Sequence, residues 1–519
     1  MSERSDAPAL ILNDDGSNFL YAADDLRRED LDAYLARLEG TQVGMVVWCV
    51  AFGGYVTYYQ SEITEPVGSG FALHDDVKQA RFVRNRERLA AEVGDYCGYV
   101  FERLGEMGIP ALASFRMNDA HMSSSPTGPG AGRFWLNHRD WCLGEPFGYY
   151  GSCLDYTHSP VREYLRRLVL EVIEKFPDIA GVELDAMRSP FFFPEGEGRE
   201  KAPIMTQFVR QIRHDLDEAA RLTGRDRYLL RMNVTRDPEL ALECGLDVAA
   251  WADEDLVDGI AAGCYNTDFQ IPLEQWQELL GGRMPVHSYI NCSPAMGVYL
   301  SREGYRGAAA NAWGSGADGA YLFNFPCLDE TARLVPVPVD RPPYPPVDFE
   351  VPGRHPHTGR TREVLYELGD REGMAHLDKQ LVFYAESQRF RHYAPDWPSI
   401  RRSEPATMQL PWRCWEDAAA AREIMLEIKL VGVTPRDEFM FTLNGAQIDG
   451  ARVERLHAAS GRDARVHAIP LDPYSLYRIA LDADDLRPGE NTLTIELTEA
   501  DPMLFNEIEP REMCVDVSY

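Results

Sequence analysis

The segment Gly181-Val-Glu-Leu-Asp-Ala-Met-Arg188 places two carboxylates at the end of a short apolar strand. Side chains alternate along a strand, so Glu183 and Asp185 are expected to lie on the same side. Carboxylates at the carboxyl end of a buried strand are typical of acid–base or nucleophilic chemistry. Asp185 is therefore the leading candidate for a nucleophile or base. Glu183 lies deeper and is expected to support the site, because a buried carboxylate needs a partner.

Other polar residues follow the remaining predicted strands in the same way. Asp268 comes two strands after Asp185 and is the candidate proton donor, with a helix cap as the alternative interpretation. Glycoside hydrolysis needs one carboxyl group to protonate the leaving oxygen and a second to attack or to activate water. Asn, Arg and His hold hydroxyl groups by directional hydrogen bonds. The candidate substrate-binding residues are Asp14, Trp48, Arg116, Asn118, Asp119, His121, Arg188, Arg231, Asn233, Tyr265, His287, Asn291 and Asn324.

The same residues allow two other interpretations. A metal-dependent lyase, isomerase or hydrolase could use Asp119 and His121 together with Glu183 and Asp185 as ligands. The chain has neither HxH on its first strand nor HExxH anywhere, so substrate binding by Asp119 and His121 is favoured, and no metal or other cofactor is expected. The other alternative is a catalytically silent sugar-binding protein, in which the acids bind hydroxyl groups only.

Eight apolar segments before residue 330 are predicted to be strands, and most are followed by amphipathic helical patterns such as Arg81–Met107 and Ala202–Thr223. Eight such repeats indicate a (β/α)8 TIM barrel, whose active site lies at the carboxyl ends of the strands. An open doubly wound sheet is disfavoured because the first strand lacks a Gly-rich turn. The predicted strands are Ala9–Leu12, Val43–Val50, Ala111–Phe115, Gly181–Leu184, Tyr228–Met232, Gly259–Cys264, Val286–Ile290 and Gly319–Phe323.

The remainder of the chain has a different pattern. Residues 331–359 are rich in proline, which excludes helix and central strand, and a short helical piece is predicted at about 361–390. From Pro405 onward, short alternating segments separated by turn signals predict an antiparallel β-sandwich. The predicted fold class is α/β, a (β/α)8 TIM barrel followed by a C-terminal antiparallel β-sandwich. The expected domains are 1–335 for the barrel, 336–404 for the linker and short helical segment, and 405–519 for the sandwich.

Composition narrows the classes of partner. The 519 residues are 45% hydrophobic, which is enough for large packed cores. The formal net charge of −31 argues against nucleic acid and against anionic membrane surfaces as partners. No signal-peptide pattern and no run of about 18 apolar residues occurs, and the ten cysteines lack CxxC spacing, so a cytoplasmic protein with reduced thiols is expected. A carbohydrate substrate is the expected partner, and the sequence leaves a homo-oligomer open.

Three parts of the chain together resemble bacterial glycoside-hydrolase-like TIM barrels with a C-terminal β-sandwich. They are the fourth strand, the run from Leu240 to Asp258, and the Asn-Gly and Arg-Pro-Gly-Glu-Asn segments near the C-terminus. This resemblance covers most of the chain and implies a two-carboxylate glycosidase acting on an oligosaccharide or a small glycoside. The aspartates on strands four and six are similar to those of retaining α-galactosidases and α-glucosidases. That similarity implies that Asp185 is the nucleophile and Asp268 the acid/base.

Overall fold

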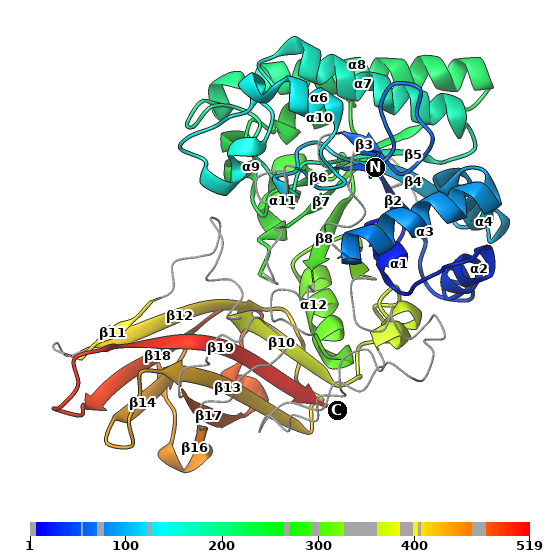
Figure 1. The fold of residues 1–519 in the computed structure, drawn as a ribbon. Helices are drawn as coiled ribbons and strands as arrows, with labels where there is room; N and C mark the ends of the chain where they lie inside the picture. The colour runs from blue at the N-terminus through cyan, green and yellow to red at the C-terminus, as the bar shows by residue number, and fades with distance from the viewer. Residues whose placement is uncertain are drawn as a thin grey trace. The chain divides into compact units, whose positions relative to one another are not determined.

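The computed structural model describes residues 7–52, 55–69, 77–121, 127–263, 270–291, 300–325, 361–384, 398–402, 406–458 and 474–519. The chain divides into two compact units, and Figure 1 shows the elements of each. One unit comprises residues 1–265, 272–289 and 318–349, and the other 266–271, 290–317 and 350–519. The predicted domain limits stay predictions, and the proline-rich residues 331–359 lie outside the described residues.

Eight parallel strands close into a barrel, which confirms the predicted fold class for this part of the chain. Each strand pairs with its neighbour in chain order, and pairings of β1 with both β9 and β2 complete the circle. This closure excludes the open doubly wound sheet, and all eight predicted strands are present. The strands are β1 (Leu10–Asp14), β2 (Met45–Phe52), β4 (Ala111–Arg116), β5 (Gly181–Asp185), β6 (Leu229–Val234), β7 (Gly259–Ala262), β8 (Val286–Asn291) and β9 (Gly319–Phe323). A short strand, β3 (Val56–Thr57), pairs antiparallel with β2.

Helices follow the strands, and α7 and α8 pack side by side (Figure 1). The helices are α1 (Asn18–Tyr21), α2 (Arg28–Ala36), α3 (Val77–Val93), α4 (Tyr96–Glu106), α6 (Arg133–Asn137), α7 (Ser159–Lys175), α8 (Gly198–Thr223), α9 (Pro238–Glu243), α10 (Val248–Asp253), α11 (Leu273–Leu280) and α12 (Arg302–Gly314). The single helix predicted over Arg81–Met107 is wrong, since α3 and α4 are separate. Gly94 has a φ of +84° and ends one helix, and Asp95 caps the next by accepting a bond from Gly98 N at 2.9 Å.

The barrel interior is filled by side chains from alternating strand positions. Ile11, Val47 and Leu112 belong to one buried cluster, together with aromatic residues of β8 and β9. Because side chains alternate along a strand, Asp14 and Trp48 point to the opposite side, toward the surrounding helices. These two residues are register partners on β1 and β2, so they share that outward face.

The second unit contains two antiparallel sheets that share one apolar core, which confirms the predicted sandwich. Buried residues of both sheets, among them Leu410, Leu426 and Leu493, belong to the same cluster. One sheet consists of β10 (Lys379–Tyr384), β11 (Ile400–Arg401), β13 (Glu423–Val431), β16 (Val453–Ala458), β17 (Tyr474–Leu481) and β19 (Glu507–Ser518). The other consists of β12 (Thr407–Cys414), β14 (Glu438–Leu443), β15 (Ala446–Gln447) and β18 (Gly489–Glu499).

Two further sequence expectations concern single elements. The helical piece predicted at about 361–390 is too long: a 3-10 helix, η5 (Thr361–Tyr366), is followed by the strand β10, which pairs with β19. The alternating apolar pattern Leu381 and Phe383 fits a strand, and both side chains enter the sandwich core. Among the described residues, the structure has no helix that combines the length and the apolar character needed to cross a membrane.

Candidate active site

A buried cluster of charges joins the carboxyl ends of β1, β4 and β5. Asp15 accepts hydrogen bonds from Arg116 and from Arg188, and Arg116 also donates to Asp119 at 2.8 Å. The guanidinium of Arg188 lies 5.0 Å from the ring centre of Phe323 at the end of β9. Burial raises the pKa of Asp15, but the two arginines lower it more, so the net pKa lies below the usual value. These contacts tie residues at the carboxyl ends of three strands into one group.

Asp119 connects this cluster to a half-exposed histidine. Its Oδ1 accepts a bond from the backbone N of His121 at 2.9 Å and also contacts the ring Nδ1 of His121. Burial raises the pKa of Asp119, but the lowering by His121 and then by Arg116 outweighs it. The net pKa lies well below the usual range. Asp119 is therefore a carboxylate at neutral pH. The histidine side chain is 50% exposed, so it can reach a molecule at the mouth of the barrel, the end at which the strands have their carboxyl ends.

Glu183 lies inside the barrel and is fully buried. Its Oε1 accepts bonds from the hydroxyl of Tyr321 at 2.8 Å, from Ser114 Oγ at 3.0 Å and from Asn233 Nδ2 at 3.3 Å. Its Oε2 has no hydrogen-bond partner within the described residues. Burial, and next the charge of Asp185, raises the pKa of Glu183 to about 8. Glu183 therefore holds a proton at neutral pH.

Asp185 ends β5, two residues closer to the mouth than Glu183. Its Oδ1 accepts a bond from the backbone N of Met187 at 2.9 Å. Burial raises the pKa of Asp185, and the charge of Arg188 opposes this shift, with a smaller effect from a hydrogen bond to Asn233. Asn233 thus interacts with both carboxylates of β5. The arrangement is a pair of interacting acids with a guanidinium beside the outer one.

Two predicted substrate-binding residues lie at the opposite end of the barrel. Arg231 and His287 occupy the amino-terminal halves of β6 and β8, and Arg231 donates to His287 Nδ1 at 3.0 Å. His287 Nε2 lies 2.8 Å from the carbonyl of Pro8, ahead of β1. Burial, and next the charge of Arg231, lowers the pKa of His287 to about 3, so the ring is neutral. This pair fills the base of the barrel, where buried polar groups usually serve stability.

Asp14 and Trp48 face the helical layer. Asp14 accepts bonds from the hydroxyl of Tyr34 at 2.6 Å and from Arg37 at 3.4 Å, both on or beside α2. Trp48 is 1% exposed, and its ring packs edge-on against Tyr96 of α4, with centroids 6.0 Å apart. Both side chains hold helices against the barrel in this structure.

Asn118 fastens the loops around the mouth to one another. Its Nδ2 donates to the carbonyls of Leu154 at 3.0 Å and of Phe191 at 2.7 Å, and its Oδ1 accepts from Leu154 N at 3.0 Å. Because donor and acceptor are both used for backbone groups, the side chain acts here as a loop clamp. It stands directly before Asp119 in the chain.

Of the remaining candidates, two lie at the ends of strands and two lie outside the described residues. Asn291 ends β8 and is buried. Asn324 follows β9 with a φ of +48°, and its backbone N donates to Asn13 Oδ1 at 3.1 Å. Such a left-handed conformation is uncommon outside glycine and is often found at functional sites. Tyr265 and Asp268 lie outside the described residues, so the Asp185–Asp268 pair stays a prediction.

Three residues of the site lie outside the predicted set. Asp15 could have been selected from strand parity, because it lies on the same side as Ile11 and Asn13 if the strand pattern continues. Tyr321 shares the inward side of β9 with Phe323 by the same rule. Ser114 carries no sequence signal that separates it from an ordinary core serine.

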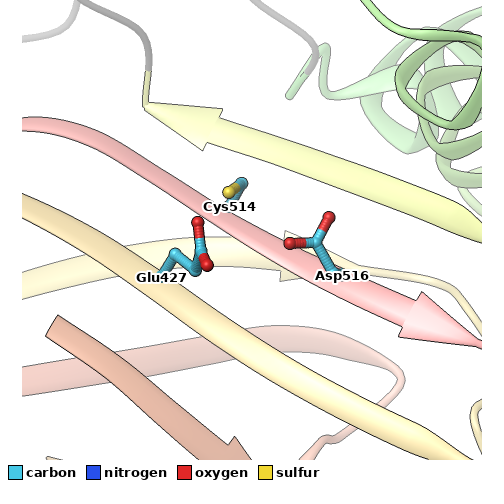
Figure 2. Close-up of side chains that lie close together, drawn as sticks. All are labelled: Glu427, Cys514 and Asp516. Carbon is cyan, nitrogen blue, oxygen red and sulfur yellow. The ribbon is translucent and has the colours of Figure 1, made fainter. Parts of the chain in front are cut away.

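One group of potential metal ligands occurs in the part of the chain that the structure describes, with its ligand atoms all within 4.8 Å of one another. It consists of Glu427 on β13 with Cys514 and Asp516 on β19, which Figure 2 shows together. Glu427 pairs with Arg478 at 2.9 Å, and Asp516 accepts from Gln380 at 2.9 Å. These contacts account for both carboxylates as parts of a hydrogen-bonded sheet surface. No residue of the barrel mouth belongs to this group.

No protein-family model matches the chain, and no curated protein matches it. Similar solved structures include the cycloisomaltooligosaccharide glucanotransferase of Paenibacillus sp., at 8% identity and a TM-score of 0.34, covering 99% of this chain and 58% of that one. The PgaB (BpsB) glycoside hydrolase domain of Bordetella bronchiseptica is 12% identical, with a TM-score of 0.37 and coverage of 63% and 97%. A class V chitinase of Pseudomonas fluorescens Pf-5 is 9% identical, with a TM-score of 0.35 and coverage of 63% and 98%.

Proposed function

We propose that this protein is a glycoside hydrolase that cleaves a glycosidic bond in an oligosaccharide or a small glycoside. The observation that carries the proposal is the pair of interacting carboxyl groups, Glu183 and Asp185, at the carboxyl end of one barrel strand. Amide, hydroxyl and guanidinium groups surround this pair, as a polyhydroxylated substrate requires. Such an arrangement suits acid–base or nucleophilic attack at a sugar carbon.

Asp185 has the proposed role of nucleophile or base. A negative charge on Asp185 raises the pKa of Glu183 two residues away, so Glu183 tends to keep its proton. Glu183 is the deeper of the two and holds that proton, while the guanidinium of Arg188 favours the charged form of Asp185. Glu183 thereby supports the charge state of Asp185. Asp268 keeps its proposed role as the acid that protonates the leaving oxygen.

The proposed substrate-binding residues are those of the mouth. Asp15 holds Arg188 and Arg116 in place by hydrogen bonds, so one side of the site has guanidinium groups whose positions are fixed before substrate binds. Asp119 and His121 form a second edge, and His121 is the more exposed of the two. The full proposed set is Arg116, Asp119, His121, Arg188, Asn233, Tyr265, Asn291 and Asn324. Arg231 and His287 fill the base of the barrel, Asp14 and Trp48 face the helices, and Asn118 clamps two loops, so these five residues are not part of the proposed set.

The test is turnover of a panel of aryl glycosides and oligosaccharides by the wild type and by Asp185→Asn, each with and without EDTA. Asp185→Asn removes the attacking charge but keeps the shape, so activity should fall on the order of a thousandfold or more with folding intact. Asp226→Asn, a change at an exposed aspartate, is the matched control and should keep wild-type rates.

Each other outcome has a defined meaning. Near-normal rates for Asp185→Asn would remove Asp185 from the mechanism. Activity that EDTA abolishes and one divalent ion restores would favour the metal-dependent alternative. Tight sugar binding without any product after long incubation would indicate a catalytically silent binding protein.

A further inference from the structure

A cluster of aromatic rings lies on the loops beside the barrel mouth. Phe147 contacts Phe191 with ring centres 5.4 Å apart, Phe191 contacts Tyr150 at 4.5 Å, and Tyr150 contacts Tyr149 at 5.3 Å. Phe147, Tyr149 and Tyr150 lie on or beside the short 3-10 helix η2 (Gly148–Ser152) in the connection after β4, whereas Phe191 belongs to the connection after β5. The rings therefore come from two loops that meet at the carboxyl ends of neighbouring strands.

These rings are open to solvent, in contrast to their neighbours in sequence. Tyr149 is 46% exposed, and Phe147, Tyr150 and Phe191 are partly exposed. The adjacent residues Phe192 and Phe193 are 1% and 4% exposed, so their side chains are buried in the core. Large aromatic side chains that stay at the surface together often mark a binding site.

The ring cluster is fixed to the candidate active site by hydrogen bonds. Asn118 donates to the backbone of Phe191 at 2.7 Å, and Asn118 directly precedes Asp119. Ser152, the last residue of η2, donates to the carbonyl of Ala120 at 3.3 Å. Ala120 N in turn donates to Ser189 Oγ at 3.2 Å. A molecule that touches His121 can therefore extend onto a surface that does not move independently of it.

We propose that Phe147, Tyr149, Tyr150 and Phe191 form a stacking surface for the part of an oligosaccharide that extends beyond the bond at Asp185. The inference rests on the proposed function. Sugar rings have apolar faces and hydroxyl edges, and tyrosine likewise combines an apolar ring face with one hydroxyl group. A cluster of four rings is larger than one sugar ring, so it favours a chain of several units over a monosaccharide.

The test measures binding against chain length. The probes are cello-, malto-, xylo- and chito-oligosaccharides of two and of six units, titrated calorimetrically into the full chain carrying Asp185→Asn, which prevents turnover. We expect one series to bind more tightly at six units than at two. Adding Tyr149→Ala or Phe191→Ala should weaken binding of the six-unit sugar by roughly three- to tenfold per ring, and leave the two-unit sugar unchanged.

Two control variants separate stacking from structural damage. Tyr149→Phe keeps the ring and should retain most of the affinity. Phe505→Ala removes a 90% exposed ring in the turn between β18 and β19 and should change nothing. An equal loss for both sugar lengths, or no loss at either, would overturn the stacking surface. Self-association that Tyr149→Ala abolishes in sedimentation runs would also overturn it, by assigning the rings to an interface between copies.

Failure of this inference can be distinguished from failure of the proposed function. Cleavage of aryl glycosides that depends on Asp185, with oligosaccharide binding independent of length, would overturn the stacking surface alone. Length-dependent binding that requires Tyr149, in a chain whose activity survives Asp185→Asn, would overturn the role of Asp185 and retain the surface.

Discussion

The protonation of Glu183 follows from its position inside the barrel. One of its carboxyl oxygens accepts three hydrogen bonds, and the whole side chain is shielded from water. The nearby charge of Asp185 makes a second negative charge still less favourable. A neutral Glu183 is the lower-energy state because it avoids both costs. With Glu183 neutral, the pair carries at most one negative charge.

This protonation predicts a pH dependence of stability that Glu183→Gln removes. The pKa of Glu183 is about 8 in the folded protein and near the usual 4.5 when unfolded. Between these values the folded state binds more protons than the unfolded state, so the free energy of unfolding falls as pH rises. Its slope is at most about 1.4 kcal/mol per pH unit for one proton. Glutamine cannot ionise, so the variant should gain stability relative to wild type as pH rises from 5 toward 8.

The measurement is urea unfolding of wild type and Glu183→Gln at several pH values between 5 and 8. Glu195→Gln, a change at an exposed glutamate, is the control and should keep the wild-type slope. Equal slopes for wild type and Glu183→Gln would contradict a raised pKa for Glu183.

The alternation of side chains along β1 decides which of two adjacent aspartates points to the mouth of the barrel. Asp14 turns outward to Tyr34 and Arg37, whereas Asp15 accepts bonds from Arg116 and Arg188. Both are acidic and neighbour each other, so residue type alone does not separate them. Their opposite directions follow from the alternation of side chains along an extended chain.

At the scale of elements, β5 begins at a position that only glycine fits. Gly181 has a φ of +156°, and a Cβ built there would lie 2.1 Å from the carbonyl oxygen of Leu229 on β6. The register of β5 against β6 pairs these same two residues. Close approach at this point places Glu183 and Asp185 beside Asn233, so the glycine contributes to the site indirectly.

Gly181→Ala should therefore destabilise the protein, by about 3 kcal/mol or more, because the backbone of one strand must shift. Gly105→Ala is the matched control, since Gly105 lies in α4 and an added Cβ meets no heavy atom within 4 Å. That change should stabilise by roughly 0.5–1 kcal/mol through helix propensity. The free energies of unfolding of both variants are measured in denaturant. An unchanged value for Gly181→Ala would show that the strands can separate there without cost.

At the scale of the molecule, the two compact units have separate apolar cores. The barrel interior contains Leu112, and the sandwich core contains Leu426, each fully buried. A unit with its own core can unfold on its own, so unfolding of this chain need not be a single two-state transition.

We expect two transitions in scanning calorimetry. Leu112→Ala should lower the midpoint of one transition, and Leu426→Ala that of the other, since each leaves a cavity worth about 2–5 kcal/mol in one core. A single transition that moves as a whole in both variants would show that the units unfold together.

The sequence by itself determined the eight strand–helix repeats, the alternating strands of the sandwich and the acidic ends of β5. These are local patterns, because periodicity depends on residues a few positions apart. The tertiary structure alone decided how deep each polar residue lies. Arg231 on β6 and His287 on β8 each share a strand with an asparagine nearer the mouth, but they fill the base of the barrel. It also decided that Glu183 is protonated and that Phe191 joins the rings near residue 149. The physical reason is that burial, hydrogen bonding and charge depend on contacts between residues that are far apart in sequence, which only barrel closure and strand register bring together.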